Sequence, residues 1–424
     1  MTATASWLIF VGTIAGVLAR PRVASLAVPP AVVALGGAAL LVAIGALPVA
    51  EVGRAAGELW RPLAGVSAVI ASAAAARRLG LLDLVVRAFA RAARGPVSRA
   101  FAAVFWGSYA VAAVLNNDAA VLVLTPAVVR ATRALYPLRP ALVVPFAFAV
   151  FGAAGVAPLV LSNPMNLVVA TWSGIGFNAY AARMAPASLA VAAVTWAMLR
   201  WHFRGLVDDA VPARGALDPW AAAPAPAGAL ALFGATLAAY PVCAALGWPT
   251  WAVALAGAAG LLAYASRRCG VGPRALAGEV EWGILAFLFG MFLQVGALRE
   301  AGLTERLRAL YASLPASGGE RAGGIALASA LGSAVFNNHP MALVNAAALR
   351  GAGAAAQRDV LAALVGGDLG PRLLPFGSLA GLLWLDALRR EGVAVAYRTF
   401  AHVGIVTTVP PLLVGALVVD ALAG

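Results

Sequence analysis

The sequence contains no lysine, two cysteines and few charged residues of either sign. Charged residues make up 11% of the 424 residues, whereas a soluble protein carries about 25%. Hydrophobic residues make up 62%, and the mean hydropathy is +0.90. Together these values exclude an ordinary soluble protein and predict a polytopic membrane protein, in which each spanning helix needs about 20 mostly apolar residues. The lack of lysine beside abundant alanine is typical of a GC-rich genome.

Residue sets for enzymatic or metal chemistry are missing. No CxxC, HExxH or P-loop motif is present, so a metal enzyme or an ATPase has no residues to support it. Cys243 and Cys269 lie away from the polar stretches described below, and His202, His339 and His402 are too scattered in sequence to suggest a ligand cluster. We therefore predict no enzyme activity, no cofactor and no metal site.

The formal net charge of +13 does not indicate nucleic-acid binding, because the arginines lie between apolar runs. Positive loops face the cytoplasm in membrane proteins. The arginine distribution is consistent with ten full spans, both termini outside, and residues 77–99 and a linker at 204–226 in the cytoplasm. The N-terminus lacks the basic region of a cleaved signal, so Trp7–Ala19 is interpreted as a retained first helix.

Apolar runs divide the chain into two similar series. Continuous spans are predicted at about 6–20, 27–48, 57–76, 185–203, 227–246, 249–266, 280–298 and 400–420. Apolar segments with polar interruptions are predicted at 100–134, 140–171, 322–350 and 358–390, a basic amphipathic segment at 77–99 and a polar helix at 300–315.

The two series can be laid on each other. Trp60 matches Trp282, Asn116-Asn117 matches Asn337-Asn338, and the break at 157–166 matches the break at 366–378. We therefore predict an all-α polytopic membrane protein built as an inverted repeat. Its two five-span halves, 1–203 and 227–424, each contain a re-entrant hairpin and a broken helix, because an odd span number turns the second half upside down. Coincidence in a chain rich in Ala, Gly and Leu is the alternative.

The stretch GGDLGPRLLPFGSLAGLLWL at 366–385 is apolar at its flanks but cannot stay helical in its middle. Pro371 and Pro375 remove backbone donors, and its glycines lower helix propensity. Unwound backbone at membrane depth is tolerated only where protein or a water-filled cavity covers it, so the stretch predicts a site for an ion or small solute. The alternative is a proline-kinked helix with a structural Asp368–Arg372 pair.

Polar side chains at the hairpin tips and at the breaks are the predicted substrate ligands. Asparagine amides both donate and accept hydrogen bonds, so they suit a hydroxylated solute or a cation. The alternative is that they only cap helix ends. The predicted substrate-binding residues are Asn116, Asn117, Ser162, Asn163, Asn166, Asn337, Asn338, Gly377 and Ser378.

Ion coupling needs a group that titrates, and only Asp118 and Asp368 are carboxylates at predicted mid-depth. Asp368 has Arg372 one turn away, whereas Asp118 has no neighbouring cation in sequence. An isolated buried carboxylate pairs or takes a proton. Asp118 is therefore the better candidate for a proton carrier, with Asp368, Arg372 and His339 as further ion-coupling candidates; a structural hydrogen-bonding role is the alternative.

At these motifs the sequence resembles the arsenite/antimonite efflux permeases of the ion transporter superfamily. The likeness rests on GGDLGPRLLPFGSLAGLLWL, FNNHPMALV, LNNDAAVLVLTP and APLVLSNPMNLV, and the hairpin tips are also similar to those of divalent-anion:sodium symporters. The resemblance implies a scaffold-and-transport fold with elevator-like alternating access. It also implies export of trivalent arsenic and antimony hydroxides driven by protons, in a bacterial inner membrane, with a soluble ATPase partner in some relatives.

The sequence departs from the family pattern at three places. Ala153-Ala154-Gly155-Val156 replaces an Asp-Thr-Ala-Ser stretch, His339-Pro340-Met341 replaces Met-Pro-Thr, and Gly367 replaces a cysteine. Binding arsenite through thiolates takes three clustered cysteines, and this chain has two, away from the site. If the chain carries arsenite, it must therefore bind the neutral trihydroxide through hydrogen bonds.

The sequence is compatible with three functions. The first is a proton-coupled arsenite/antimonite exporter. The second is a sodium-coupled anion transporter or a sodium/proton antiporter of the same superfamily. The third is a non-transporting membrane subunit or enzyme, which would need a catalytic constellation or a large soluble domain that the sequence does not contain.

Overall fold

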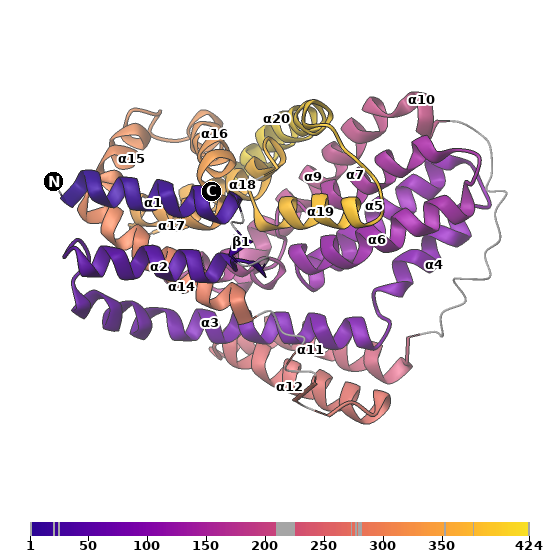
Figure 1. Cartoon of the computed structure of the whole chain (residues 1–424), viewed down its shortest axis with the longest axis horizontal. Coiled ribbons are helices and arrows are strands. Elements are labelled where there is room, and N and C mark those ends of the chain that lie inside the picture. The colour runs from indigo at the N-terminus through magenta and orange to yellow at the C-terminus, as the bar shows by residue number, and fades with distance from the viewer. Residues whose placement is uncertain are drawn as a thin grey trace.

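The computed structural model describes residues 2–19, 22–23, 26–208, 225–272, 274–275, 278, 282–351, 353–375 and 377–422. Within them almost every element is a helix (Figure 1). The first run comprises α1 Thr2–Ala19, α2 Pro30–Ala43, α3 Val49–Arg78, α4 Asp83–Ala92, α5 Val97–Val114, α6 Asn117–Leu135, η1 Pro140–Leu142, α7 Val143–Ala153, η2 Val160–Ser162, α8 Pro164–Trp172, α9 Phe177–His202 and α10 Arg204–Val207.

The second run repeats this order after the linker. It comprises α11 Ala227–Ala245, α12 Thr250–Cys269, α14 Trp282–Glu300, α15 Leu303–Ala312, α16 Gly319–Phe336, α17 Asn338–Ala348, α18 Ala354–Leu369, η4 Gly370–Arg372, α19 Leu379–Arg390 and α20 Tyr397–Ala421. In both runs a ten-residue helix follows the third long helix, and a hairpin, a broken helix and a long helix come next. The described linker residues include α10, and 209–224 lie outside the described residues.

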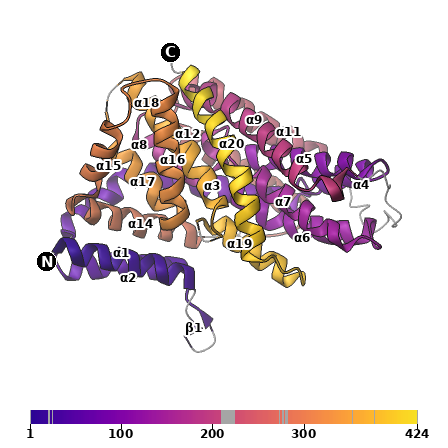
Figure 2. The same ribbon diagram turned by 90° about the horizontal axis from the view of Figure 1, so that it is seen from above.

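Packing between the runs is reciprocal. Helix α3 packs against α12 and α14 packs against α2, while α6 packs against α19 and α17 against α8. The last long helices, α9 and α20, lie side by side, as Figures 1 and 2 show. Such an exchange of equivalent partners is what a two-fold relation between two halves produces. The predicted fold class, an all-α polytopic membrane protein with an inverted repeat, is confirmed.

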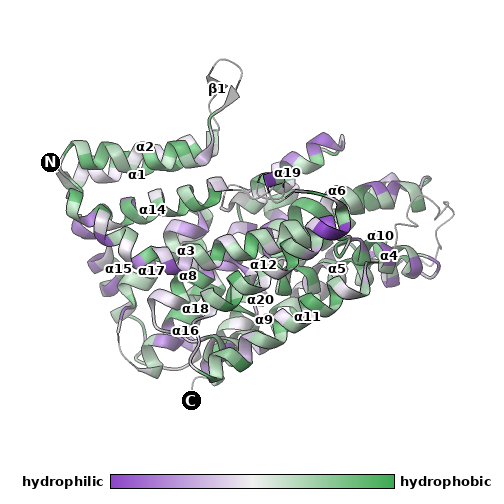
Figure 3. Cartoon of the chain, turned by 90° about the horizontal axis from the view of Figure 1, so that it is seen from below, coloured by the Kyte–Doolittle hydropathy of each residue, from purple (hydrophilic) through white to green (hydrophobic). Residues whose placement is uncertain are grey.

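Six of the described helices are long and apolar enough to cross a membrane: α3, α5, α9, α11, α14 and α20. Helices α1, α2 and α7 supply shorter apolar segments. Hydrophobic colour predominates along α9, α11 and α20 in Figure 3, and hydrophilic colour collects on α15 and near α4 and α10. Large apolar side chains such as Leu230, Leu413 and Leu417 remain exposed, as a lipid-facing surface requires. The count of ten spans stays a prediction.

Two local features differ from the predicted pattern. Residues Arg22–Val23 (β1) and Leu26–Ala27 (β2) form a short antiparallel pair between α1 and α2. The basic amphipathic segment at 77–99, whose apolar face would suit a membrane surface, contains α4, which buries Val85, Val86 and Phe89 as it packs against α5 and α6. Its apolar face is therefore covered by protein helices.

Glycines bring α16 and α18 into backbone contact beside the second break. A Cβ at Gly366 would lie 1.9 Å from the Ala326 carbonyl oxygen, and one at Gly370 would lie 2.2 Å from that of Ala330. Only glycine fits these two positions, because real Cβ atoms do not approach backbone oxygens so closely. Small residues let membrane helices approach in this way. The contact fixes the hairpin of the second run against its broken helix.

Candidate functional site

Both predicted hairpin tips lie against the break of their own half. At the first tip, the Asn117 side-chain amide donates to the Gly155 carbonyl at 2.9 Å. At the second tip, the Asn338 backbone N–H donates to the Gly377 carbonyl at 2.9 Å. The breaks therefore face the tips, and each tip satisfies a carbonyl that the unwound chain leaves free.

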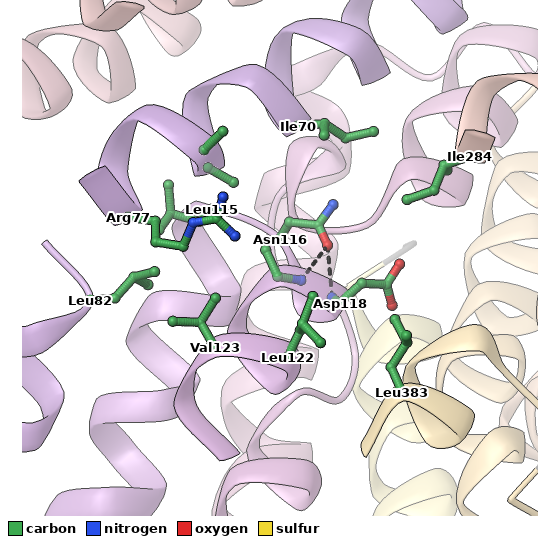
Figure 4. A pocket seen from close by; sticks show the side chains of 13 residues that line it. Ile70, Arg77, Leu82, Leu115, Asn116, Asp118, Leu122, Val123, Ile284 and Leu383 are labelled. Carbon is green, nitrogen blue, oxygen red and sulfur yellow. Dashed lines mark hydrogen bonds between the residues drawn. The ribbon is translucent and has the colours of Figure 1, made fainter. Parts of the chain in front are cut away.

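The first tip opens onto a cavity of about 60 Å³, which we call the Asp118 cavity (Figure 4). Asn116 caps α6, because its side-chain oxygen accepts from the Asp118 and Ala119 N–H groups at 2.7 and 3.3 Å. Asp118 thus lies in the first turn of a helix, where a carboxylate is favoured. Arg77 of α3 lines the same cavity. The cation that sequence spacing did not reveal therefore comes from a distant helix.

The remaining walls of the Asp118 cavity come from helices outside the hairpin. Ile70 belongs to α3, Ile284 to α14 and Leu383 to α19. Figure 4 shows Arg77 entering from α3 and Asp118 from the start of α6. The cavity lies where α3 and α14 meet the first hairpin tip and the half-helix after the second break.

The other predicted carboxylate joins the two halves. Asp368 accepts from the Asn163 and Asn166 side-chain amides at 2.8 and 2.9 Å and from the Ala157 N–H at 3.0 Å. These donors surround the start of α8, so the carboxylate of the second break lies at a half-helix N-terminus of the first break. A carboxylate with three donors is a well-satisfied acceptor. We call these contacts the Asp368 network.

Arg372 does not form the i,i+4 ion pair with Asp368 on which the alternative of a proline-kinked helix rested. Its guanidinium donates to the carbonyls of Gly152 and Thr407 at 2.5 and 2.8 Å and to the Thr195 hydroxyl at 3.1 Å. Gly152 is in the last turn of α7, where a cation is favoured. After Leu369 the helix tightens into the 3₁₀ turn η4, which turns Arg372 away from the helix face that carries Asp368. Arg372 instead satisfies the end of α7.

Sequence reasoning missed the contribution of α9. The Tyr180 hydroxyl accepts from the Asn166 amide at 2.8 Å and donates to the Ala157 carbonyl at 3.0 Å, and the Ser188 hydroxyl donates to the Val156 carbonyl at 2.5 Å. Together with Thr195 they recur about every two turns along one face of an otherwise apolar helix. That spacing was the available signal. The Tyr180 and Ser188 hydroxyls satisfy the unwound backbone of the first break, and Thr195 accepts from Arg372.

The second tip holds its polar groups more loosely. Asn337 adopts a φ of 77° and accepts from the His339 N–H at 3.2 Å, and the His339 ring lies 5.9 Å from the ring of Phe287 in α14. Ser378 caps α19 by accepting from the Gly381 N–H at 3.0 Å. Five buried side-chain atoms at the tips and breaks lack a hydrogen-bond partner among the described residues: Asn166 Oδ1, Ser333 Oγ, Asn338 Oδ1, His339 Nε2 and Arg372 Nε.

Ser162 has a structural place. Its hydroxyl donates to the Ala113 carbonyl near the end of α5 and accepts from the Leu159 N–H. The predicted substrate residues therefore fall into three groups rather than one cavity: Asn116 beside Asp118, Asn163 and Asn166 on Asp368, and the second tip with Gly377.

The remaining histidines and cysteines lie elsewhere. His202 and His402, far apart in sequence, have ring centres 5.1 Å apart at the ends of α9 and α20. Within the described residues no group of three or more His, Cys, Asp or Glu side chains is placed to hold a metal ion. Cys243 and Cys269 are free thiols outside the three groups.

Comparison with known proteins decides the family. Residues 5–421 match the family model described as arsenical pump membrane protein. The chain belongs to the arsenical pump membrane protein family. An arsenical pump membrane protein of Escherichia coli is 31% identical over 89% of this chain and 90% of its own length. One from Yersinia enterocolitica is 34% identical over 72% of this chain and 73% of its own length.

A solved structure shows the same fold. The YdaH transporter of Alcanivorax borkumensis, described as having an unusual topology, aligns with 99% of this chain and 97% of its own at a TM-score of 0.58. Its sequence identity of 16% limits the comparison to the fold. Family membership confirms the resemblance found in the motifs, and the chain is a multi-pass membrane transport protein of the arsenical pump family.

Proposed function

We propose that this protein exports arsenite and antimonite from the cytoplasm in exchange for protons. It would work in the bacterial inner membrane as a secondary transporter with both termini outside. Family membership supports an arsenical as the cargo. The observation that carries the proton coupling is the Asp118 cavity, which places one carboxylate and a buried amide at a hairpin tip.

In this proposal Asp118 is the residue that binds and releases the proton. The cavity is large enough for about four water molecules, so a proton has a route to the carboxylate. Arg77 lines the same cavity, and a cation that approaches a carboxylate favours its charged form, so a motion that changes their separation would change the affinity of Asp118 for a proton. Asp368 holds the two breaks together instead, because its three donors come from the other half. His339 remains a candidate at the matching tip.

We propose that the cargo binds as the neutral trihydroxide through amides. The unpaired oxygens of Asn166 and Asn338 are buried acceptors that hydroxyl donors of the cargo can satisfy. The side chains of Asn116 and Asn337 cap helices, and that of Asn117 donates to the Gly155 carbonyl. In this proposal these three residues therefore shape the tips. Neither cysteine lies in these groups, which favours hydrogen bonding over thiolate ligation.

We further propose that residues 1–203 and 227–424 are the two repeats, with 204–226 as a cytoplasmic linker. The repeated order of helices and their reciprocal packing support this division. A soluble ATPase is an optional partner in the same proposal, and it would bind on the cytoplasmic side, where the linker lies.

The alternative is sodium coupling, as in a sodium-coupled anion transporter or a sodium/proton antiporter. This alternative is favoured by Asn166: its side-chain nitrogen donates to Asp368, and its side-chain oxygen is buried without a hydrogen-bond partner among the described residues. Sodium takes oxygen ligands, and a carboxylate beside an amide oxygen supplies two.

Uptake of radiolabelled arsenite into everted membrane vesicles tests the proposal. Vesicles energised with a proton gradient should accumulate arsenite, and a sodium gradient alone should not drive accumulation. Accumulation that needs sodium and survives a proton uncoupler would replace the proposal with its alternative. Accumulation that needs ATP and a soluble fraction would show that the chain does not act as a secondary transporter.

A further inference from the structure

A second cavity lies at the other end of α3. It has a volume of about 40 Å³ and is lined by Glu51, Glu58, Trp172 and Arg299 among others. Glu51 is in the first turn of α3, whereas Arg77 of the Asp118 cavity is in its last turn. The 30 residues of this helix extend about 45 Å, more than the hydrocarbon thickness of about 30 Å. The two cavities therefore lie toward opposite faces of the membrane.

The two cavities are related by the internal repeat. Helix α3 supplies four wall residues to the Asp118 cavity, and α14 supplies four to the second cavity. Each residue of the first set lies 222 positions before its equivalent in the second set. The matched pairs are Ile70 with Phe292, Ala73 with Val295, Ala74 with Gly296, and Arg77 with Arg299. The other walls correspond as well, because α6 and α19 at the Asp118 cavity are replaced by α17 and α8 at the second cavity.

Trp172, at the end of α8, closes one side of the second cavity. Its ring centre lies 5.7 Å from the ring of Phe292, and the Arg350 guanidinium lies 5.7 Å from its ring on the α17 side. Beyond it is a third cavity of about 90 Å³, lined by Ser173, Arg350 and Gln357, which shares Trp172 as a wall. One aromatic side chain thus separates two polar spaces.

We propose that the second cavity is the outward mouth of the transport path and the repeat-related counterpart of the Asp118 cavity. Arg77 and Arg299 are matched residues at the two mouths, and Trp172 is the barrier of the outer one. A cavity of this size holds about three water molecules, which suits a small hydroxylated solute better than an organic anion. The outward assignment and the cargo rest on the proposed function; the pairing of the cavities rests on the structure.

Matched cysteine variants test the proposal. In a chain carrying Cys243→Ala and Cys269→Ala, Ala74→Cys and Gly296→Cys each introduce one thiol at equivalent positions. A Cβ at Gly296 meets only Leu47 at 3.8 Å, so the substitution fits. The probe is a small, charged, membrane-impermeant methanethiosulfonate reagent, applied to intact cells and to inside-out vesicles. Leu413→Cys, half-exposed on α20, is the lipid-facing control and should react from neither side.

We expect Gly296→Cys to react from the outside alone and Ala74→Cys from the cytoplasmic side alone. Adding Trp172→Ala should raise the rate at Gly296→Cys several-fold and leave Ala74→Cys unchanged. Reaction of both thiols from one side, reaction of neither, or reversed sides would overturn the proposal. The labelling uses no arsenical and so does not depend on the cargo. If the thiols react from opposite sides in a chain that does not accumulate arsenite, the proposed cargo is wrong and the assignment of the two mouths is retained.

Discussion

Replacing Asp368 by asparagine should destabilise the fold through lost acceptors. Asparagine keeps one acceptor oxygen, so at least one of the three donors on Asp368 faces an NH₂ group. A donor left unpaired costs about 1–3 kcal/mol, and the two surviving hydrogen bonds each lose about 1 kcal/mol of charge assistance. The expected loss is therefore roughly 3–5 kcal/mol.

The assay is the thermal midpoint at which the detergent-solubilised chain, fused to a fluorescent protein, stops eluting as a single species. Asp386→Asn is the matched control, because Asp386 pairs with the exposed Arg390 at 2.8 Å and such surface pairs contribute at most about 1 kcal/mol. The double variant Asp368→Asn with Asn163→Asp exchanges the amide and the carboxylate across the hydrogen bond between positions 163 and 368. It should recover part of the stability that Asp368→Asn loses. An Asp368→Asn chain as stable as the Asp386→Asn control would refute the reasoning.

Three further predictions concern a close helix contact, the two cysteines and Arg372. Gly366→Ala should sharply reduce the yield of folded protein, since overpacking costs about 1–3 kcal/mol or more. Gly367→Ala is its control: the added Cβ would meet nothing closer than 3.6 Å, so this variant should express normally on the same elution assay. Replacing Cys243 and Cys269 together by alanine should leave arsenite accumulation at the parental level, and its loss in a correctly inserted chain would implicate a thiol. Arg372→Lys should fail to restore the stability lost in Arg372→Gln, because one ammonium cannot reach three separated acceptors; full recovery would show that charge alone matters there.

Much of the fold follows from local pattern in the sequence. Apolar run lengths located most helices to within a few residues, although α3 and α9 each begin eight residues before the predicted spans at 57–76 and 185–203. The matches of Trp60 with Trp282 and of the paired asparagines indicated the repeat. Prolines and glycines marked both breaks, because their effect on the backbone is local. The short β1–β2 pair carried no such signal.

The partners of the polar groups depended on tertiary structure. Sequence spacing suggested that Asp368 binds Arg372, but the 3₁₀ turn at Gly370 separates their faces. Asp368 finds its donors in the other half, and Arg372 binds Gly152 and Thr195 of the other half and Thr407 of its own. Asn163 and Asn166 were predicted to face substrate, and the structure places their amide groups on Asp368. Neither contact is encoded by spacing, because about two hundred residues separate the partners.

Arg77 shows the same limit at the Asp118 cavity. Helices α4 and α5 separate it from Asp118 in the sequence, and only the tertiary fold brings the end of α3 to the wall of this cavity. The hydroxyls of α9 were discoverable from their regular spacing on an apolar helix, yet what they bind depended on where the first break lies.

Asp118→Asn tests most directly whether Asp118 carries the proton, since the change keeps shape and hydrogen bonding while removing titration. The measurement compares proton-driven arsenite accumulation in everted vesicles with arsenite exchange between equal pools in proteoliposomes. We predict that Asp118→Asn abolishes accumulation and retains exchange, because exchange requires no net proton movement. Accumulation at the parental rate would contradict the claim and pass the coupling role to Asp368, to His339 or to a bound cation.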